Sequence, residues 1–234
     1  DIKLFDKWQE ISNNQIKLVT IAPENSNNMD FIKHVKKHYP ELVVSIGHSD
    51  ASFEQANEAI KAGACHCTHL YNAMSSFHHR KPGIPGAVLV SDDITAELIL
   101  DGVHLHPGSV QLAVKAKGLD KLVLVTDAMR ARCMGNGEFE LGGQKVIVKG
   151  MNASLEGGVL AGSIVSQFQA LRMFIEQTGL GLSDAVKLSA ENPAKQLNIY
   201  NKYGSLDVGK VADMIVLSSS LVVKSVYLSS NKVI

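Results

Sequence analysis

The chain has 234 residues, with 23 Lys and Arg residues against 23 Asp and Glu residues, so its formal net charge is zero. Hydrophobic residues make up 45% of the sequence and charged residues 20%, as in ordinary globular proteins. Balanced charge gives no electrostatic basis for binding nucleic acid or an anionic membrane. No apolar run approaches the roughly 20 residues of a membrane span, and three cysteines are too few for a disulfide scaffold. We therefore expect a soluble, cytoplasmic protein with one large domain, or with one domain and a small annex.

Short apolar runs alternate with amphipathic stretches through the first half of the chain. Five runs rich in Val, Ile and Leu predict strands covered on both faces, as in a parallel sheet. These runs are Ile16–Ile21, Leu42–Ile46, Ala64–His69, Thr95–Leu100 and Leu122–Thr126. Between them, helices are predicted at Met29–His38, Ser52–Ala62 and Pro107–Lys117, with Ser52 as an N-cap. This alternation is typical of consecutive βα units.

The pattern changes after Asp127. Phe139–Leu141 and Lys145–Lys149 flank two glycines and predict a β-hairpin. Further on, helices are predicted at Ser163–Thr178 and at Leu182–Leu197, the second broken or kinked at Asn192-Pro193. The last strand-like pieces are Met214–Leu217 and Val222–Leu228. They predict a small β annex at the end of the chain.

Polar side chains follow the five predicted strands, at the point where each strand ends. These ends are Pro23-Glu24, Gly47-His48-Ser49, Thr68-His69, Asp101-Gly102-Val103-His104 and Thr126-Asp127. Because the carboxyl ends of all strands of a (β/α)8 barrel converge on one face, we expect these groups to be neighbours. Two imidazoles and a carboxylate suit zinc or iron, which lowers the pKa of a bound water to about 7. A carboxylate within reach can then accept the proton of that water.

Other polar residues fit structural roles. His34 and His38 lie on a lysine-rich helix and are expected to be solvated, and His106 precedes a helix start. Cys65 and Cys67 resemble a thiolate metal site in spacing, but they lie deeper in the predicted strand than His69. We expect both cysteines to act as small hydrophobic residues in the barrel interior.

Two segments contain residues that suit contact with a ligand. Asn72, Ala73 and Arg80 lie on the loop after the third strand, and arginine suits phosphate through its planar fork of donors. A solvated basic loop is an equal alternative for Arg80. The glycine-rich segment Gly157–Ser163 approaches a helix N-terminus, where N–H groups can meet an anion or a hydroxyl. It lacks the Lys-Ser/Thr ending of a P-loop and so does not predict a nucleotide site.

Taken in order, these residues resemble the N-acetylglucosamine-6-phosphate deacetylases of the amidohydrolase superfamily. The most specific match is Thr68–Met74, and Gly209–Asp213 marks the superfamily at large. The other matches are Val19–Glu24, Gly47–Ser49, Pro82-Gly83, Asp101–His104, Val125–Met129, Leu160–Ser163 and Asn192–Ala194. The resemblance implies a (β/α)8 barrel with a small β-sandwich, a homodimer, and hydrolysis of an N-acetyl group to give glucosamine 6-phosphate and acetate.

The resemblance also implies roles for single residues. His48 and His69 match the two metal-binding histidines, and Asp127 matches the aspartate that acts first as base and then as acid to the departing amine. His104 matches the histidine that contacts the substrate beside the scissile amide. Matched substrate-binding positions are Asn72, Ala73, Arg80, Leu160, Ala161 and Gly162, with Arg80 as the candidate for binding the 6-phosphate. The implied cofactor is one divalent metal ion, zinc with iron as the alternative, and a second metal is left open.

One part of the family pattern is missing. The family's glutamate ligand lies in a His-Leu-Glu-Gly-Pro motif that this sequence lacks, and Glu24 belongs to a separate match. The five predicted strands match the fourth to eighth barrel strands, as in the C-terminal part of a longer enzyme. We therefore expect residues 1–200 to form a partial (β/α)8 barrel with a hairpin and loop insertion at 136–162. Residues 201–234 are expected to be the C-terminal strands of a small β-sandwich.

Three functions remain open from the sequence. The first is deacetylation of an amino-sugar phosphate, and the second is another cyclic-amide or deaminase chemistry on the same scaffold. The third is an incomplete chain that binds sugar phosphate or only self-associates. Asn72, Ala73 and Arg80 favour the first over the second, whereas the missing glutamate favours the third and Asp127 opposes it. We expect the isolated chain neither to close as a barrel nor to deacetylate efficiently.

Overall fold

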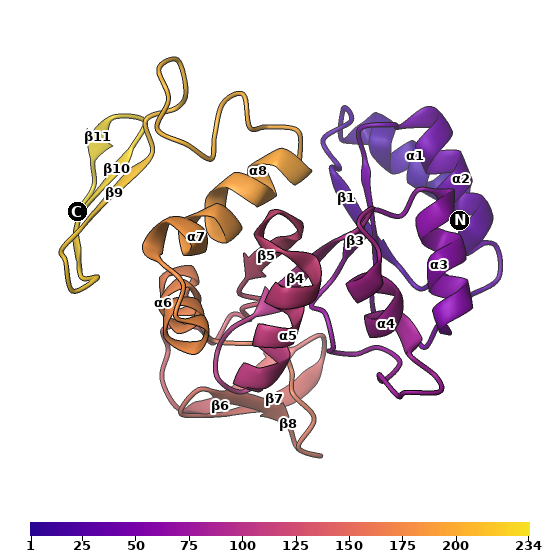
Figure 1. Ribbon diagram of the computed structural model, residues 1–234, viewed down its shortest axis with the longest axis horizontal. Helices are drawn as coiled ribbons and strands as arrows, with labels where there is room; N and C mark the ends of the chain where they lie inside the picture. Colours follow the sequence, from indigo (N-terminus) through magenta and orange to yellow (C-terminus); the bar gives the residue numbers. More distant parts are fainter.

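The computed structural model of the protein describes residues 1–234, and its first half alternates strands with helices (Figure 1). Five parallel strands form one open sheet in the order β1-β2-β3-β4-β5, so consecutive strands are neighbours. The strands are β1 Leu18–Ile21, β2 Val43–Ile46, β3 His66–Cys67, β4 Thr95–Ile99 and β5 Leu122–Val125. All five predicted strands are confirmed, each shorter than its apolar run.

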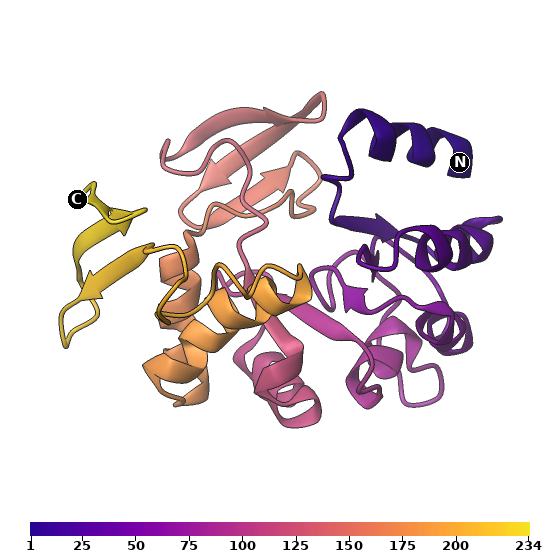
Figure 2. The same cartoon turned by 90° about the horizontal axis from the view of Figure 1, so that it is seen from above.

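Helices line one side of this sheet (Figure 2). They are α1 Ile2–Ile11, α2 Asn28–His38, α3 Phe53–Ala62, α4 Gly83–Val90 and α5 Pro107–Lys117. Helix α1 packs against α2, where the rings of Phe5 and Phe31 meet edge to face. The three predicted helices are confirmed, and Ser52 caps α3 through a bond from the Gln55 N–H to Ser52 Oγ of 3.2 Å. Helices α1 and α4 are additions to the predicted helices. Helix α4 is apolar all round and carries two glycines and a proline, so no amphipathic period marks it.

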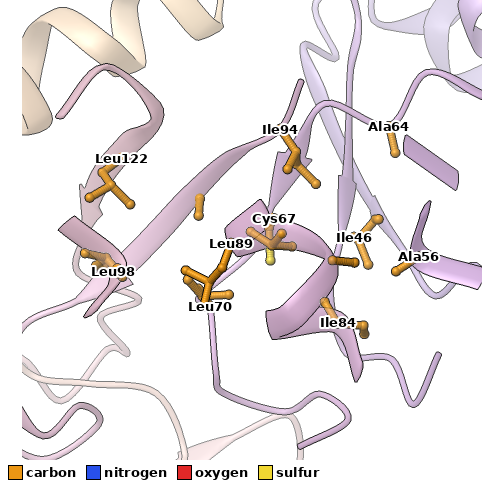
Figure 3. Close-up of a cluster of buried hydrophobic side chains, with 14 of the residues drawn as sticks. Ile46, Ala56, Ala64, Cys67, Leu70, Ile84, Leu89, Ile94, Leu98 and Leu122 are labelled. Carbon is orange, nitrogen blue, oxygen red and sulfur yellow. The ribbon is translucent and has the colours of Figure 1, made fainter. Parts of the chain in front are cut away.

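The main core lies between the sheet and its helices. Cys67 is buried there with Ile84 and Leu89 of α4 and with Ile46 of β2 (Figure 3). The expectation that Cys67 fills a barrel interior is therefore wrong. Since successive side chains of a strand point to opposite faces, His66 takes the other face of β3. Cys65 is half-buried, and neither cysteine joins a group of metal-ligating side chains.

A second, antiparallel sheet follows β5 and lies on the side of the main sheet opposite most helices (Figure 2). Its strands are β6 Gly137–Leu141, β7 Gln144–Lys149 and β8 Asn152–Leu155. The predicted hairpin is confirmed, with positive φ at both turn glycines, and β8 is an addition. This sheet has a small core of its own, in which Val146 and Val148 pack with Met129 and Ala161. The core joins the segment after Asp127 to the segment before Ser163.

The helices that follow differ from prediction at two points. Helix α6 spans Gln167–Thr178 with Ser166 as its N-cap, so the predicted start at Ser163 is wrong because Ser163 forms a β-bridge with Ala128. The second predicted helix consists of α7 Leu182–Val186, a π-helical segment η2 Lys187–Glu191 and α8 Asn192–Gln196. The predicted break therefore takes the form of a π-helical segment directly before Asn192-Pro193. Pro193 lies in the first turn of α8, where its missing N–H is tolerated.

The chain ends in a third sheet, which stands apart from the main sheet (Figures 1 and 2). Its antiparallel strands are β9 Met214–Leu217, β10 Val223–Leu228 and β11 Asn231–Lys232. The two predicted strands are confirmed, and β11 is an addition. None of the helices combines the length and the apolar character that a membrane crossing requires.

Candidate active site

His48 and His69 follow the adjacent strands β2 and β3, and their rings meet. The two Nε2 atoms are 2.8 Å apart, and the rings lie edge to face at a centroid distance of 4.6 Å. His69 is 5% exposed, whereas His48 is open to solvent. Burial lowers the pKa of His69, His48 lowers it further, and the nearby Asp127 carboxylate partly opposes them. A lowered pKa favours the neutral imidazole, the form that binds metal ions.

The backbone is unusual at the three strand ends that carry the predicted metal and catalytic residues. His48, His69 and Asp127 have φ values of +50°, +32° and +48°. Residues other than glycine seldom adopt positive φ, and such strain of about 1–3 kcal/mol per residue persists only where the surroundings enforce it. Strain of this kind clusters at active sites. These three residues therefore belong to turns that the fold holds in place.

Glu24 holds the turn that contains His48. One carboxylate oxygen, Oε2, accepts a hydrogen bond from Ser49 Oγ at 2.6 Å, and Oε1 accepts one from the Asp50 N–H at 2.7 Å. The Ser49 N–H in turn donates to the carbonyl oxygen of Ala73 at 3.1 Å. Both oxygens of Glu24 are thus used by the loop.

Glu97 and His66 hold the turn that contains His69, and neither residue is among those predicted from the sequence. Glu97 Oε2 accepts a hydrogen bond from the His69 N–H at 3.1 Å, and Oε1 lies 2.9 Å from His66 Nε2. Burial raises the pKa of Glu97, but the bonds and charge from His66 and the bond from His69 outweigh it and hold the pKa below its ordinary value. Glu97 is the one charged residue of β4, and the other residues of this strand are buried. Such an isolated charge was the signal in the sequence that Glu97 has a special role.

Asp127 is joined to the predicted substrate loop. The Ser163 N–H donates to the Asp127 carbonyl oxygen at 2.8 Å, and the Met129 N–H donates to the Ser163 carbonyl oxygen at 2.9 Å. Gly162 has a φ of +69°, and a Cβ there would lie 3.0 Å from the Asp127 carbonyl oxygen. The structure thus brings the predicted segment Leu160–Gly162 beside Asp127, whose side chain is exposed.

His104 is fixed by Asp101, which is 3% exposed. Asp101 Oδ2 lies 2.6 Å from His104 Nδ1, and Oδ1 accepts the N–H groups of Val103 and His104, each at 2.8 Å. Burial raises the pKa of Asp101, but these hydrogen bonds outweigh it and lower the pKa overall. The ring therefore presents its Nε2 atom away from the carboxylate. His106 has the structural role expected of it, since its Nδ1 accepts the Gly108 N–H at the start of α5.

The remaining predicted substrate residues lie on the loop after β3. The Asn72 side chain donates to the carbonyl oxygens of His69 and Leu70 at 3.3 and 3.2 Å, so it supports the turn that contains His69. Ala73 supports the His48 loop through its carbonyl oxygen. Arg80 is exposed, and its Nη1 lies 2.7 Å from His79 Nε2. Arg80 thus makes no hydrogen bond to the histidine pair.

The donor set can be compared with what a metal ion requires. Two imidazole nitrogens on one tetrahedral zinc ion, each at about 2.0–2.1 Å, are separated by about 3.3 Å. The Nε2 atoms of His48 and His69 are 2.8 Å apart and fit such a pair after a shift of about half an ångström. No group of three or more His, Cys, Asp or Glu side chains in the chain is placed to hold a metal ion. This chain thus supplies two fitting ligands and no complete set.

Comparison with known proteins identifies the family. The chain belongs to the amidohydrolase family, whose sequence model matches residues 2–233, and enzymes of this family are generally metal-dependent. Over 219 residues it is 46% identical to N-acetylglucosamine-6-phosphate deacetylase of Bacillus subtilis (strain 168), covering 94% of this chain and 55% of that protein. Over 228 residues it is 35% identical to N-acetylgalactosamine-6-phosphate deacetylase of Escherichia coli O157:H7, covering 97% of this chain and 60% of that protein.

Solved structures agree with the sequence matches. A mutant N-acetyl-D-glucosamine-6-phosphate deacetylase from Mycobacterium smegmatis, in complex with N-acetyl-D-glucosamine-6-phosphate, has a TM-score of 0.94 at 31% identity. The alignment covers 100% of this chain and 62% of that chain. The resemblance inferred from the sequence motifs is thereby confirmed. The chain spans little more than half the length of the curated relatives that it matches.

Proposed function

We propose that this chain is part of an N-acetylglucosamine-6-phosphate deacetylase, which hydrolyses the N-acetyl group to give glucosamine 6-phosphate and acetate. The observation that carries the proposal is the left-handed backbone of His48, His69 and Asp127 at strand ends of one sheet, together with the meeting of the two imidazoles. The names of the relatives support the substrate. A cytoplasmic location and a homodimer are part of the proposal.

The arrangement of the sheets supports a domain division. We assign residues 1–200 to a partial (β/α)8 barrel, in which β1 to β5 correspond to the fourth to eighth strands. The β6–β8 sheet belongs to an insertion at 136–162, and residues 201–234 are the last strands of a small β-sandwich. Parallel order with every strand beside its predecessor is what a segment of such a barrel requires.

His48 and His69 are the residues that would hold one divalent cation, zinc with iron as the alternative. When bound, the cation supplies Lewis acidity that lowers the pKa of water and polarises an amide carbonyl. The Asp127 carboxylate accepts a proton from the attacking water and then delivers a proton to the departing amine nitrogen. His104 is held through Nδ1 by Asp101, so that its Nε2 atom is the one that faces the substrate carbonyl.

Substrate contacts are assigned to two loops. Asn72 and Ala73 shape the loop after β3, and Leu160–Gly162 lies beside Asp127. Arg80 is exposed, and we assign its planar fork of donors to the 6-phosphate. Deacetylation of N-acetylgalactosamine 6-phosphate is the second candidate function, because a relative of 35% identity carries that name. An incomplete chain that only binds sugar phosphate is the alternative without catalysis.

The test measures acetate release from both sugar phosphates by the longest polypeptide that carries this sequence. Asp127→Asn is expected to keep its metal and to lower the turnover by about 10²–10⁴-fold, because an amide cannot carry the proton. Exposed Asp92→Asn is the matched control and keeps the wild-type rate. A near-normal rate for Asp127→Asn would refute the assignment.

Two further variants test the binding roles. His69→Ala is expected to lose bound metal, and unaltered metal content would remove His69 from the ligands. Arg80→Ala is expected to raise the KM for the phosphorylated sugar while sparing the unphosphorylated sugar. Equal effects on both sugars would end the assignment of Arg80 to phosphate.

A further inference from the structure

Glu97 is a charged residue in the middle of β4, where the residues on both sides of it are buried. Its side chain is 16% exposed. A carboxylate so far removed from water is tolerated only when hydrogen bonds satisfy its oxygens. The groups that Glu97 contacts therefore explain why a charged residue occupies this position in the strand.

Those groups belong to β3 and to the turn that follows it. Glu97 Oε2 accepts the His69 N–H at 3.1 Å, and the main-chain oxygen of Glu97 accepts the Leu70 N–H at 2.9 Å. One residue of β4 thus binds two consecutive N–H groups of the turn, one through its side chain and one through its backbone. On the other side, Oε1 lies 2.9 Å from Nε2 of the buried His66. That contact prevents the carboxylate from rotating away from His69.

The turn needs such a partner because of its conformation. His69 has a φ of +32°, which is uncommon for a residue with a Cβ and is kept only where neighbouring groups enforce it. Its ring lies with Nε2 2.8 Å from Nε2 of His48, and its Nδ1 is buried without a hydrogen-bond partner. No hydrogen bond to Nδ1 therefore orients the His69 ring. Its direction depends on the backbone of the turn, which Glu97 holds.

We propose that Glu97 is a positioning residue that aims the His69 ring at His48 and so sets the affinity of the pair for a divalent cation. The proposal rests on the proposed function in taking this pair as half of a metal site. Partners of metal ligands act in this way, and their loss typically weakens metal binding by about 10–100-fold. Glu97 contacts His69 only through the backbone N–H and would not itself touch the cation.

The experiment titrates the purified chain with Zn²⁺ by calorimetry and compares Glu97→Gln and Glu97→Ala with the wild type. The glutamine variant keeps one acceptor oxygen, and we expect its Kd to rise about 10-fold, with a larger rise for alanine. Glu138→Gln is the matched control, since Glu138 is exposed on β6 and pairs only with Lys145, and its Kd is expected to stay unchanged. Circular dichroism establishes that each titrated variant is folded.

A purely structural role would lower the melting temperature of Glu97→Gln without changing its Kd. Nitrogen-15 spectra of the histidine rings in the metal-free protein provide the second readout, in which Glu97→Gln should shift the His69 resonances. An unchanged Kd overturns the proposed effect of Glu97 on affinity, and unchanged resonances overturn its positioning of the ring. In either case the proposed function stands if His69→Ala abolishes zinc binding. If the wild type binds no zinc, the proposed function loses its metal pair, and the His69 resonances alone decide whether Glu97 positions the ring.

Discussion

Gly47 lies between β2 and His48, and replacing it with alanine tests how the site is packed. A Cβ at Gly47 would lie 2.7 Å from Thr68 Cβ and 2.9 Å from Thr20 Cγ2, closer than non-bonded carbon atoms approach each other in proteins. The φ of Gly47 is not in the left-handed region, so the obstacle is contact and not backbone strain. Because the Thr68 Cβ is attached directly to the backbone, no side-chain rotation can move it. The strands themselves must separate.

The expected loss of stability follows from the hydrogen bonds that a separation of the strands would disturb. Thr68 Oγ1 is 2.6 Å from Ser45 Oγ and 2.9 Å from Thr20 Oγ1, which links the ends of β1, β2 and β3. Forcing a methyl group into packed space costs about 1–3 kcal/mol, and each weakened hydrogen bond adds about 0.5–1.5 kcal/mol. We expect Gly47→Ala to lower the free energy of unfolding by about 2–4 kcal/mol. In a chain of this size, the melting temperature then falls by roughly 4–16 °C.

Urea unfolding followed by circular dichroism measures this loss. Gly157→Ala is the matched control, because a Cβ at Gly157 meets no atom within 4 Å and its φ is not positive. We expect the control to lie within about 0.5 kcal/mol of the wild type. The reasoning is refuted if Gly47→Ala also unfolds within that margin. Since His48 and His69 follow the displaced residues, Gly47→Ala should weaken zinc binding as well.

Three further predictions concern single side chains. Ser163 is fully buried, and Ser163→Ala leaves the Thr126 carbonyl without its hydroxyl donor, which should cost about 1–3 kcal/mol in urea unfolding. Exposed Ser220→Ala should cost almost nothing, and equal losses would contradict this. Because the folded-state pKa of Asp101 is lowered, its contribution to stability is full above the unfolded pKa of about 3.9 and is lost as the pH falls through the folded pKa. Asp101→Asn should therefore flatten the acid side of the stability profile between pH 7 and pH 2, and an unchanged slope would count against it. Iodoacetamide labelling followed by mass spectrometry should modify exposed Cys133 first and spare Cys67, whose thiol pKa is raised by burial; similar rates at both would show that Cys67 is accessible.

Local patterns were sufficient for most of the main sheet and its helices. The apolar run at Leu42–Ile46 and the cap at Ser52 act through neighbours in sequence, so β2 and the start of α3 could be read directly. Helix α4 could not, because all but the last of its residues are buried and no polar face alternates with an apolar one. Cys67 was assigned to the wrong side of its strand for a similar reason. Alternation separates two faces but does not say which one the helices cover.

The sequence by itself determined which chemistry is available in this protein, because His48, His69, His104 and Asp127 recur where strands end and parallel strands bring their ends to one edge. Only the tertiary structure decided how these groups are held. Glu97 meets His66 and His69 across the β3–β4 pair, and Ser163 meets Asp127 after an intervening sheet. Each of these contacts is a single hydrogen bond between residues far apart in the chain. Their partners are set by strand register and loop closure, which leave no periodic mark in a sequence.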